Sequence, residues 1–188
     1  MRITGGRLRG RPLFGPGDSR VRPTSDKVRQ AIFNLLEHHP ELGEFSLFGA
    51  RVLDLFAGAG TLGFEALSRG AAYCLFVDDS AESRAVIRRN VEAFDLTGAT
   101  KIWRRDAAAL GRLDTLAPFD LAFLDPPYGK DLIAPSLAAM SDGGWLVKGA
   151  IVVTESDERD SIALPKRLFD IDQRNYGGTT VTLLHYKE

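Results

Sequence analysis

The chain alternates between short apolar runs and segments in which apolar residues recur every three or four positions. Short apolar runs predict β-strands, and the longer period predicts amphipathic α-helices. Strands are expected near residues 51–56, 73–78, 100–104, 119–124 and 150–155. Helices are expected near residues 60–69, 80–95 and 131–142, with a weaker one around 107–113. Strands that alternate with helices predict an α/β fold with a parallel sheet and right-handed crossovers.

Both ends of the chain depart from this alternation. An apolar stripe from Val28 to Leu36 predicts an N-terminal helix that ends near His38, with Thr24 or Ser25 as its N-cap. The C-terminal part predicts a β-hairpin, because two strand-like runs flank a glycine turn. These runs are residues 168–175 and 180–186, and the turn is 176–179. The hairpin is expected to give the sheet an antiparallel end.

Residues 51–70 have the pattern of strand, glycine loop and helix that opens a Rossmann-like unit. Gly58, Gly60 and Gly63 match the spacing G-x-G-x-x-G, in which missing side chains let a ligand approach the backbone and let a helix pack closely on a strand. Nicotinamide dehydrogenases share this spacing, with an acidic residue after the next strand to hold a ribose, and Asp78 fits that position. The glycine loop alone leaves the cofactor open.

A carboxylate just before the glycines bears on the choice of cofactor. Asp54 would repel the pyrophosphate of a dinucleotide at this position, whereas it would attract the ammonium group of a methionine. The position therefore favours S-adenosylmethionine over a nicotinamide cofactor.

The segment Asp125-Pro-Pro-Tyr128 follows a buried-strand pattern at residues 121–124. Neither proline can continue the strand, because proline has no N–H for the ladder. The resulting stiff loop offers a planar amine the carboxylate of Asp125, the carbonyl oxygen of Pro126 and the flat ring of Tyr128. Two acceptors that bind the protons of the amine free its lone pair and stabilise the positive charge that develops during attack. Such a loop suits an acceptor of methyl groups and has no use in hydride transfer.

The N-terminal segment concentrates positive charge. Residues 1–30 hold eight Lys and Arg against two Asp, a net charge of +6, although the whole chain carries −1. A basic arm on an acidic body predicts contacts with phosphates. Its glycines and prolines predict an extended backbone, in part a hairpin, that orders on RNA; a merely solubilising tail is the alternative. Removal of residues 1–20 is expected to leave the rest of the chain folded.

These motifs together resemble one family. Residues 1–11, the segment Arg22-Pro-Thr-Ser-Asp-Lys-Val-Arg-Gln-Ala-Ile-Phe-Asn-Leu-Leu36 and the Asp-Pro-Pro-Tyr loop are similar to the RsmD family of bacterial enzymes, which methylate N2 of a guanine in 16S ribosomal RNA. The resemblance covers essentially the whole chain. It implies a Rossmann-like class I methyltransferase domain at 24–188, with a seven-stranded, mostly parallel sheet and an antiparallel C-terminal hairpin. A basic arm at 1–23 would precede this domain and contact the RNA.

The resemblance, with the rule that ligands bind at the carboxyl ends of the strands, implies roles for particular residues. Asp125, Pro126 and Tyr128 are the expected catalytic residues. The ribose ligand is Asp78 or its neighbour Asp79, and Asp106 either binds the adenine or caps the following helix. The expected cofactor-binding residues are Asp54, Phe56, Gly58, Gly60, Asp78, Asp106 and Ala107. The expected RNA contacts are Arg7, Arg9, Arg11 and Arg22.

Other functions share parts of this pattern. A DNA adenine N6 or protein glutamine N5 methyltransferase would share the catalytic loop, and an NAD-dependent oxidoreductase would share the glycine loop. A non-catalytic module could use the arm to bind ribosomal RNA without methylating it. A cytosine C5 methyltransferase is disfavoured, because Cys74 lies in an apolar run as a core residue and not in a catalytic loop.

The remaining expectations concern surroundings and partners. His38, His39 and His185 have no metal-ligand spacing, so no metal is expected. The chain has no apolar run long enough for a membrane span and no signal-peptide pattern, so a cytoplasmic location is expected. The protein is also expected to be a monomer. Its expected cofactor is S-adenosylmethionine. Its expected partner is 16S rRNA, in the small ribosomal subunit or in an assembly intermediate.

Overall fold

The computed structural model describes residues 1–15, 25–160 and 162–187, and these form a central sheet covered by helices on both faces. The α-helices are α1 (Asp26–His38), α2 (Thr61–Ser68), α3 (Ala81–Ala93) and α4 (Ile133–Asp142). Three short 3-10 helices are η1 (Pro40–Leu42), η2 (Thr97–Ala99) and η3 (Ala107–Ala109). The strands are β1 (Arg51–Leu55), β2 (Tyr73–Val77), β3 (Thr100–Trp103), β4 (Phe119–Leu124), β5 (Leu146–Asp157), β6 (Leu168–Tyr176) and β7 (Thr179–Tyr186).

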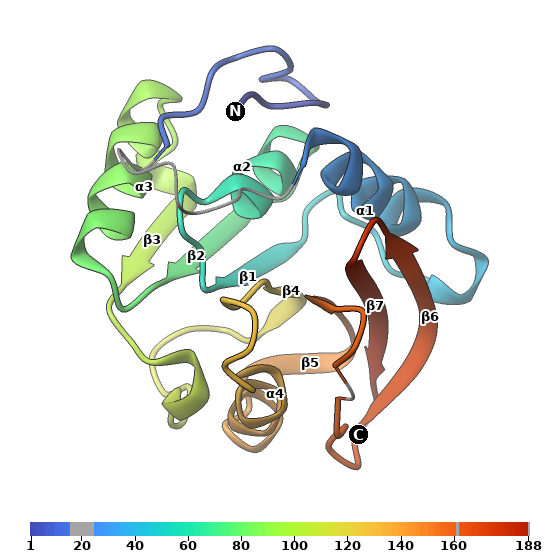
Figure 1. The fold of residues 1–188 in the computed structure, drawn as a ribbon. Helices are drawn as coiled ribbons and strands as arrows, with labels where there is room; N and C mark the ends of the chain where they lie inside the picture. Colours follow the sequence, from blue (N-terminus) through green and yellow to red (C-terminus); the bar gives the residue numbers. More distant parts are fainter. Residues whose placement is uncertain (16–24, 161, 188) are drawn as a thin grey trace.

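The seven strands lie in the order β3-β2-β1-β4-β5-β7-β6. Neighbours from β3 to β5 pair in parallel, whereas β7 runs antiparallel to both β5 and β6. The expected α/β fold, with a mostly parallel sheet and an antiparallel C-terminal hairpin, is confirmed (Figure 1).

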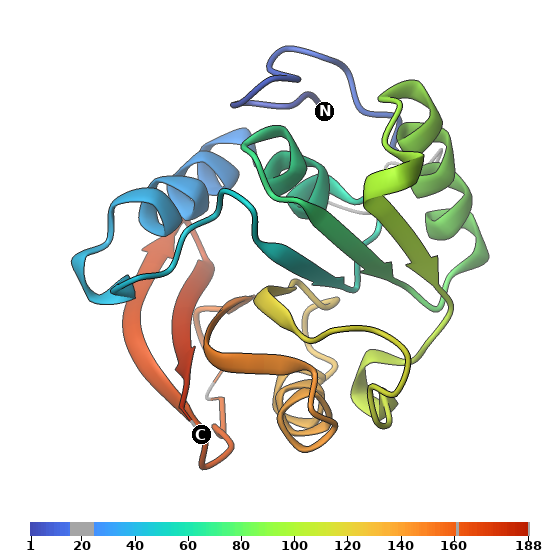
Figure 2. The ribbon, with the colours of Figure 1, turned by 180° about the vertical axis from the view of Figure 1, so that it is seen from behind.

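Alternate residues of the strands supply two separate apolar layers. Val52, Phe76 and Phe123 face one side, where they pack with apolar residues of α1, α2 and α3. Leu53, Leu75 and Leu124 lie on the other side, against α4 and η3. Because strands buried on both faces need apolar residues at every position, the continuous runs in the sequence match this arrangement (Figures 1 and 2).

Element boundaries follow local signals, with two differences from expectation. Ser25 caps α1, as its hydroxyl accepts a hydrogen bond from the N–H of Val28 at 3.2 Å. The α-helix expected at 107–113 is wrong: it is the single 3-10 turn η3, followed closely by Gly111 at a φ of 68°. Strand β5 begins at Leu146 instead of residue 150, because Leu146 pairs with Phe119 before the register shifts.

The first fifteen residues pack against the domain. Ile3, Leu8 and Leu13 are buried in the same apolar layer as α2 and α3, over which the chain passes (Figure 1). An antiparallel bridge joins Arg2 and Pro12, which is the hairpin character expected of this segment. The expectation that residues 1–20 can be removed without harm to the fold is therefore wrong, since their removal would expose part of the core. The boundary expected at residue 23 lies outside the described residues.

A buried ion pair fastens this segment to α1 and α2. The side chains of Arg29 and Glu65 are both fully buried, and Arg29 Nε lies 3.3 Å from Glu65 Oε2. The other hydrogen bonds of the Glu65 carboxylate come from the Thr4 N–H at 2.9 Å, the Thr4 hydroxyl at 2.8 Å and Arg69 Nε at 2.9 Å. Arg29 thus belongs to the core, and its charge does not count among those that the arm offers to phosphates.

Candidate active site

The two loops singled out in the sequence meet where the strand order reverses. Strand β1 pairs with β2 on one side and with β4 on the other, so the chain turns in opposite directions after these two strands. The glycine loop follows β1 and the Asp125–Tyr128 loop follows β4. A cavity of about 710 Å³ lies against both loops. Such a switch point is the usual ligand site of an open α/β sheet.

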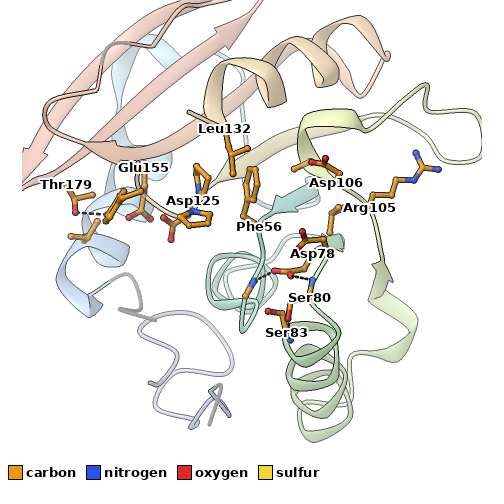
Figure 3. A pocket seen from close by; sticks show the side chains of 18 of the residues that line it. Phe56, Asp78, Ser80, Ser83, Arg105, Asp106, Asp125, Leu132, Glu155 and Thr179 are labelled. Atoms are coloured by element: carbon orange, nitrogen blue, oxygen red, sulfur yellow. Dashed lines mark hydrogen bonds between the residues drawn. The ribbon is translucent and has the colours of Figure 1, made fainter. Parts of the chain in front are cut away.

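One half of the cavity is built around Asp78, which follows β2. Its two carboxylate oxygens accept hydrogen bonds from the N–H groups of Gly58 and Ser80, each at 2.8 Å (Figure 3). Asp78 therefore fixes the glycine loop relative to the start of α3. Asp79 also lines the cavity, but no such contact to the glycine loop is found for it. Which of the two carboxylates holds a ribose stays a prediction.

Gly63 serves the close packing of α2 on the sheet. A side chain at Gly63 would collide with Phe76, Cys74 and the Asp54 carboxylate. Gly60 has a φ of 77°, and a side chain there would meet Phe64 and Phe76. Close packing therefore explains why Gly60 and Gly63 are glycines. In dinucleotide-binding folds, too, the third glycine of this motif lets the helix pack closely on the strand.

Asp54 lies beneath the glycine loop. It is buried, and its Oδ2 accepts a hydrogen bond from the Gly63 N–H at 2.9 Å. Burial raises the pKa of this carboxyl well above its usual range; the Gly63 N–H lowers that pKa, and the charges of Asp125 and Asp78 raise it further. Asp54 is absent from the described lining of the cavity, so its contact with a methionine ammonium stays a prediction.

Phe56 enters the cavity from the end of β1, where Figure 3 shows its ring beside Leu132. Its backbone has a φ of 57°, in the left-handed region that bulky side chains rarely adopt. Such strain persists only where the surrounding structure imposes it, and it concentrates at functional sites.

Asp106 and Ala107 line the same half of the cavity after β3. The Asp106 Oδ1 accepts a hydrogen bond from the Ala108 N–H at 2.8 Å, so its expected role as an N-cap is confirmed. Arg105, Ser80 and Ser83 also line this half and were missed in the sequence. Both serines lie at the first turn of α3, a position that a helix N-cap pattern could have indicated.

The other half of the cavity contains the expected catalytic loop. Asp125, Pro126 and Tyr128 all line it, and the Tyr128 hydroxyl lies 3.1 Å from the Thr179 hydroxyl on β7. Half of the Tyr128 surface is exposed. Tyr176 and Gly177 of the hairpin turn also line the cavity, although their pattern indicated a turn and no site.

Glu155 is the acidic residue that sequence reasoning missed. It lies on β5, is 3% exposed, and lines the same part of the cavity as Asp125 (Figure 3). The signal was an acidic residue shortly after the apolar run 150–153, near the carboxyl end of the strand. A second cavity of about 210 Å³ also borders Glu155, Pro126 and Tyr128.

The cavity is acidic. Among its lining residues that the structure describes, the positive charge is that of Arg105. Five carboxylates oppose it: Asp78, Asp79, Asp106, Asp125 and Glu155. A site with this balance attracts cations and disfavours a pyrophosphate.

The arginines expected to contact RNA lie outside this cavity. Arg7 and Arg9 are exposed on the N-terminal segment. Arg11 is exposed as well, but its guanidinium donates to the Ala93 carbonyl at 2.6 Å and lies over the Phe94 ring at 4.9 Å. Arg22 falls outside the described residues. Contacts of these arginines with RNA stay a prediction.

Three further observations concern metal sites, membrane spans and the cysteine in the described part of the chain. Nowhere in residues 1–15, 25–160 and 162–187 do three or more His, Cys, Asp or Glu gather as a possible metal site. No helix in the described part of the chain is long and apolar enough to cross a membrane. Cys74 is buried in the sheet, and burial raises the pKa of its thiol well above the usual value. Its position in the core was expected.

Known proteins resemble this chain over most of its length. A family model described as "Conserved hypothetical protein 95" matches residues 1–185. Ribosomal RNA small subunit methyltransferase D of Escherichia coli is 31% identical, over 100% of this chain and 90% of that protein. The same-named protein of Haemophilus influenzae is 28% identical, over 94% of this chain and 89% of that one.

The fold is also found among solved structures. The Escherichia coli protein yhhF aligns over 100% of this chain and 98% of its own, with a TM-score of 0.81 and 29% identity. An RNA methyltransferase of Salinibacter ruber, solved with S-adenosyl-L-homocysteine, is 13% identical and has the same fold, with a TM-score of 0.65 over 89% of this chain and 95% of that one. By the extent of its family match and its identity to these relatives, the chain belongs to the RsmD family of methyltransferases.

Proposed function

We propose that this protein transfers a methyl group from S-adenosylmethionine to the exocyclic N2 amine of a guanine in small-subunit ribosomal RNA. The observation that carries the proposal is the meeting of the glycine loop and the Asp125–Tyr128 loop around one acidic cavity at the switch point. The names of the Escherichia coli and Haemophilus influenzae relatives support the ribosomal RNA substrate.

The residues of the first half of the cavity fit the cofactor. Asp78 and Asp106 offer carboxylate oxygens that suit the ribose hydroxyls and the adenine amine, respectively. Phe56, Val77 and Ala107 provide apolar surface for the flat base. The acidic lining suits a cationic sulfonium group. When bound there, S-adenosylmethionine would supply an electrophilic methyl group. We propose that Gly58, Gly60 and Asp54 hold its methionine portion.

The residues of the second half would act on the acceptor. Asp125 and the Pro126 carbonyl accept hydrogen bonds from the two N–H groups of the amine and hold its lone pair toward the methyl group, while Tyr128 stacks on the base. Alignment of the amine carries most of the rate. No strong base is needed before attack, because the methylated amine is acidic and loses its proton afterwards.

Replacement of Asp78 separates the two candidate ribose ligands. Asp78→Ala should weaken binding of both S-adenosylmethionine and S-adenosylhomocysteine by about 1–3 kcal/mol, because a charge-assisted acceptor is lost. Asp79→Ala should have a smaller effect, since it is the Asp78 carboxylate that binds the Gly58 N–H and is held at the glycine loop. Calorimetric titration of both variants measures the difference, and a larger loss for Asp79→Ala would reverse the assignment.

Replacement of Tyr128 tests stacking on the base. Tyr128→Ala should reduce kcat/KM by the equivalent of about 1–3 kcal/mol, because the ring is lost. Tyr128→Phe should lose about 1 kcal/mol or less, since it removes only the hydroxyl contact with Thr179. Thr179→Val is the matched control and should resemble Tyr128→Phe. Equal activity of Tyr128→Ala and Tyr128→Phe would rule out stacking.

Arg7 and Arg9 offer the clearest test of the N-terminal segment, because they are exposed and no side-chain bond holds them in the described structure. Arg7→Gln with Arg9→Gln should weaken binding to small-subunit particles and flatten the plot of log affinity against log salt by about 0.7–0.9 per lost contact. Point changes are used instead of truncation, because Ile3, Leu8 and Leu13 of this segment are buried in the core. The control is Arg112→Gln: Arg112 is exposed, and its neighbour Leu113 packs on the apolar layer that does not include the N-terminal segment. This variant should leave the slope unchanged, and an unchanged slope in the double variant would refute the RNA contact.

A competition among acceptors tests the proposed substrate. Labelled methyl groups from S-adenosylmethionine should pass to small-subunit particles that lack the modification, and not to duplex DNA or to protein. Transfer to DNA or to protein glutamine would favour one of the related methyltransferases instead. Tight binding of NAD with no response to S-adenosylhomocysteine would indicate an oxidoreductase, and binding of particles without transfer would indicate an RNA-binding module.

A further inference from the structure

Glu155 is buried where the proposed acceptor base would lie. Leu124, the last residue of β4, pairs with Thr154 on β5, so Asp125 and Glu155 each come one residue after this pair. Both line the main cavity, and Figure 3 shows their carboxyl groups in the same part of it. Glu155 is 3% exposed, so its carboxyl group is held within the wall of the cavity.

The hydrogen-bonding groups of guanine suit a second carboxylate, Glu155, beside that of Asp125. The Watson–Crick edge of guanine carries the N1–H and the N2 amine side by side, so the edge presents only donors near the reacting nitrogen. Adenine and cytosine instead have a ring nitrogen with a lone pair next to their amine. An enzyme that reads an unstacked base does so through hydrogen bonds to this edge.

We propose that Glu155 accepts a hydrogen bond from the N1–H of the guanine and thereby selects guanine over bases with an acceptor at this position. The inference rests on the proposed function, in which Asp125 and Pro126 bind the adjacent N2 amine. A carboxylate facing the lone pair of adenine N1 or cytosine N3 would repel it. A site built to bind a donor rejects the analogue that lacks one, because its buried acceptor is left unpaired.

The second cavity agrees with this position. Like the main cavity, it is lined by Pro126, Pro127, Tyr128 and Glu155. Glu155 therefore borders both cavities beside Tyr128, where a base stacked on Tyr128 would present its edge. Thr154, the neighbour of Glu155, lines neither cavity and provides a control.

The test uses 2-aminopurine, which keeps the amine of guanine but has an acceptor at N1. Small-subunit particles are reassembled with either guanine or 2-aminopurine at the target position, and kcat/KM is measured for each. The wild-type protein should prefer guanine by about 10- to 100-fold. Glu155→Gln can donate to the 2-aminopurine N1 and should narrow this preference about tenfold or more. Glu155→Asp, which keeps the carboxylate, should retain a preference for guanine.

The outcomes separate the inference from the proposed function. Thr154→Val should keep the wild-type preference, and affinity for S-adenosylhomocysteine should be unchanged in all variants. Failure of the wild-type protein to methylate guanine would overturn the proposed function. Methylation of guanine with an equal use of 2-aminopurine by the wild-type protein would overturn the role of Glu155 alone. An unchanged preference in a folded Glu155→Gln protein would overturn it as well.

Discussion

Asp125→Ala should reduce methyl transfer by at least about 10²–10³-fold, the loss typical for removal of one group that stabilises developing charge. Asp125 lines the half of the cavity assigned to the acceptor amine, away from Asp78 and Asp106. Its carboxylate is proposed to act on the acceptor and not on the cofactor. Affinity for S-adenosylhomocysteine should therefore stay within about threefold of the wild-type value. Single-turnover kinetics and calorimetric titration measure the two quantities separately.

A matched control accompanies this variant. Asp142 lies at the exposed end of α4, and its side chain lines neither cavity. Asp142→Asn removes this carboxylate and should leave turnover unchanged. Wild-type turnover in Asp125→Ala would show that the catalytic assignment is wrong. A loss of turnover matched by an equal loss of cofactor affinity would instead place Asp125 in the cofactor site.

Glu65→Ala should lower the free energy of unfolding by up to about 3–5 kcal/mol, because it removes the buried carboxylate that pairs with Arg29 and leaves the half-exposed Asp26 as the acidic partner of that guanidinium. The variant also removes the acceptor for both the N–H and the hydroxyl of Thr4. The N-terminal segment should then be released from α2. Urea denaturation measures the loss of stability, and limited proteolysis should cleave residues 1–15 faster than in the wild-type protein.

Two further variants identify the cause of this effect. Glu65→Gln keeps the shape and part of the hydrogen bonding, so its loss of stability should be intermediate. Glu92→Ala, on the exposed face of α3, should change stability by no more than about 0.5 kcal/mol. A loss for Glu65→Ala no greater than that for Glu92→Ala would contradict the account of the buried ion pair.

The sheet and its ligand edge could be predicted because local patterns determine them. Apolar runs gave the strands, and Gly58, Gly63 and the prolines after Asp125 marked the two loops that end β1 and β4. The rule that ligands bind at a switch point then brought Asp78, Asp106 and Asp125 to one cavity. The structure confirms that these three carboxylates line it.

The contacts that could not be predicted join segments far apart in the sequence. The residues next to Arg29 in the sequence suggest that its charge lies at the surface. In the structure Arg29 is buried, because it pairs with Glu65, which is 36 residues away. Likewise, Ile3 and Leu8 lie in a glycine-rich basic segment whose composition predicts exposure, whereas packing on α2 and α3 buries them. Glu155 was missed because a single acid in a strand carries no motif.

Identification of the methylated nucleoside tests the central proposal most directly. Small-subunit particles lacking the modification are incubated with the protein and labelled S-adenosylmethionine, and the RNA is digested to nucleosides and separated. We expect the label in N2-methylguanosine at a single position, with none after reaction with Asp125→Ala. Label in N6-methyladenosine or in a carbon-methylated base, or no transfer by the folded wild-type protein, would contradict the proposal.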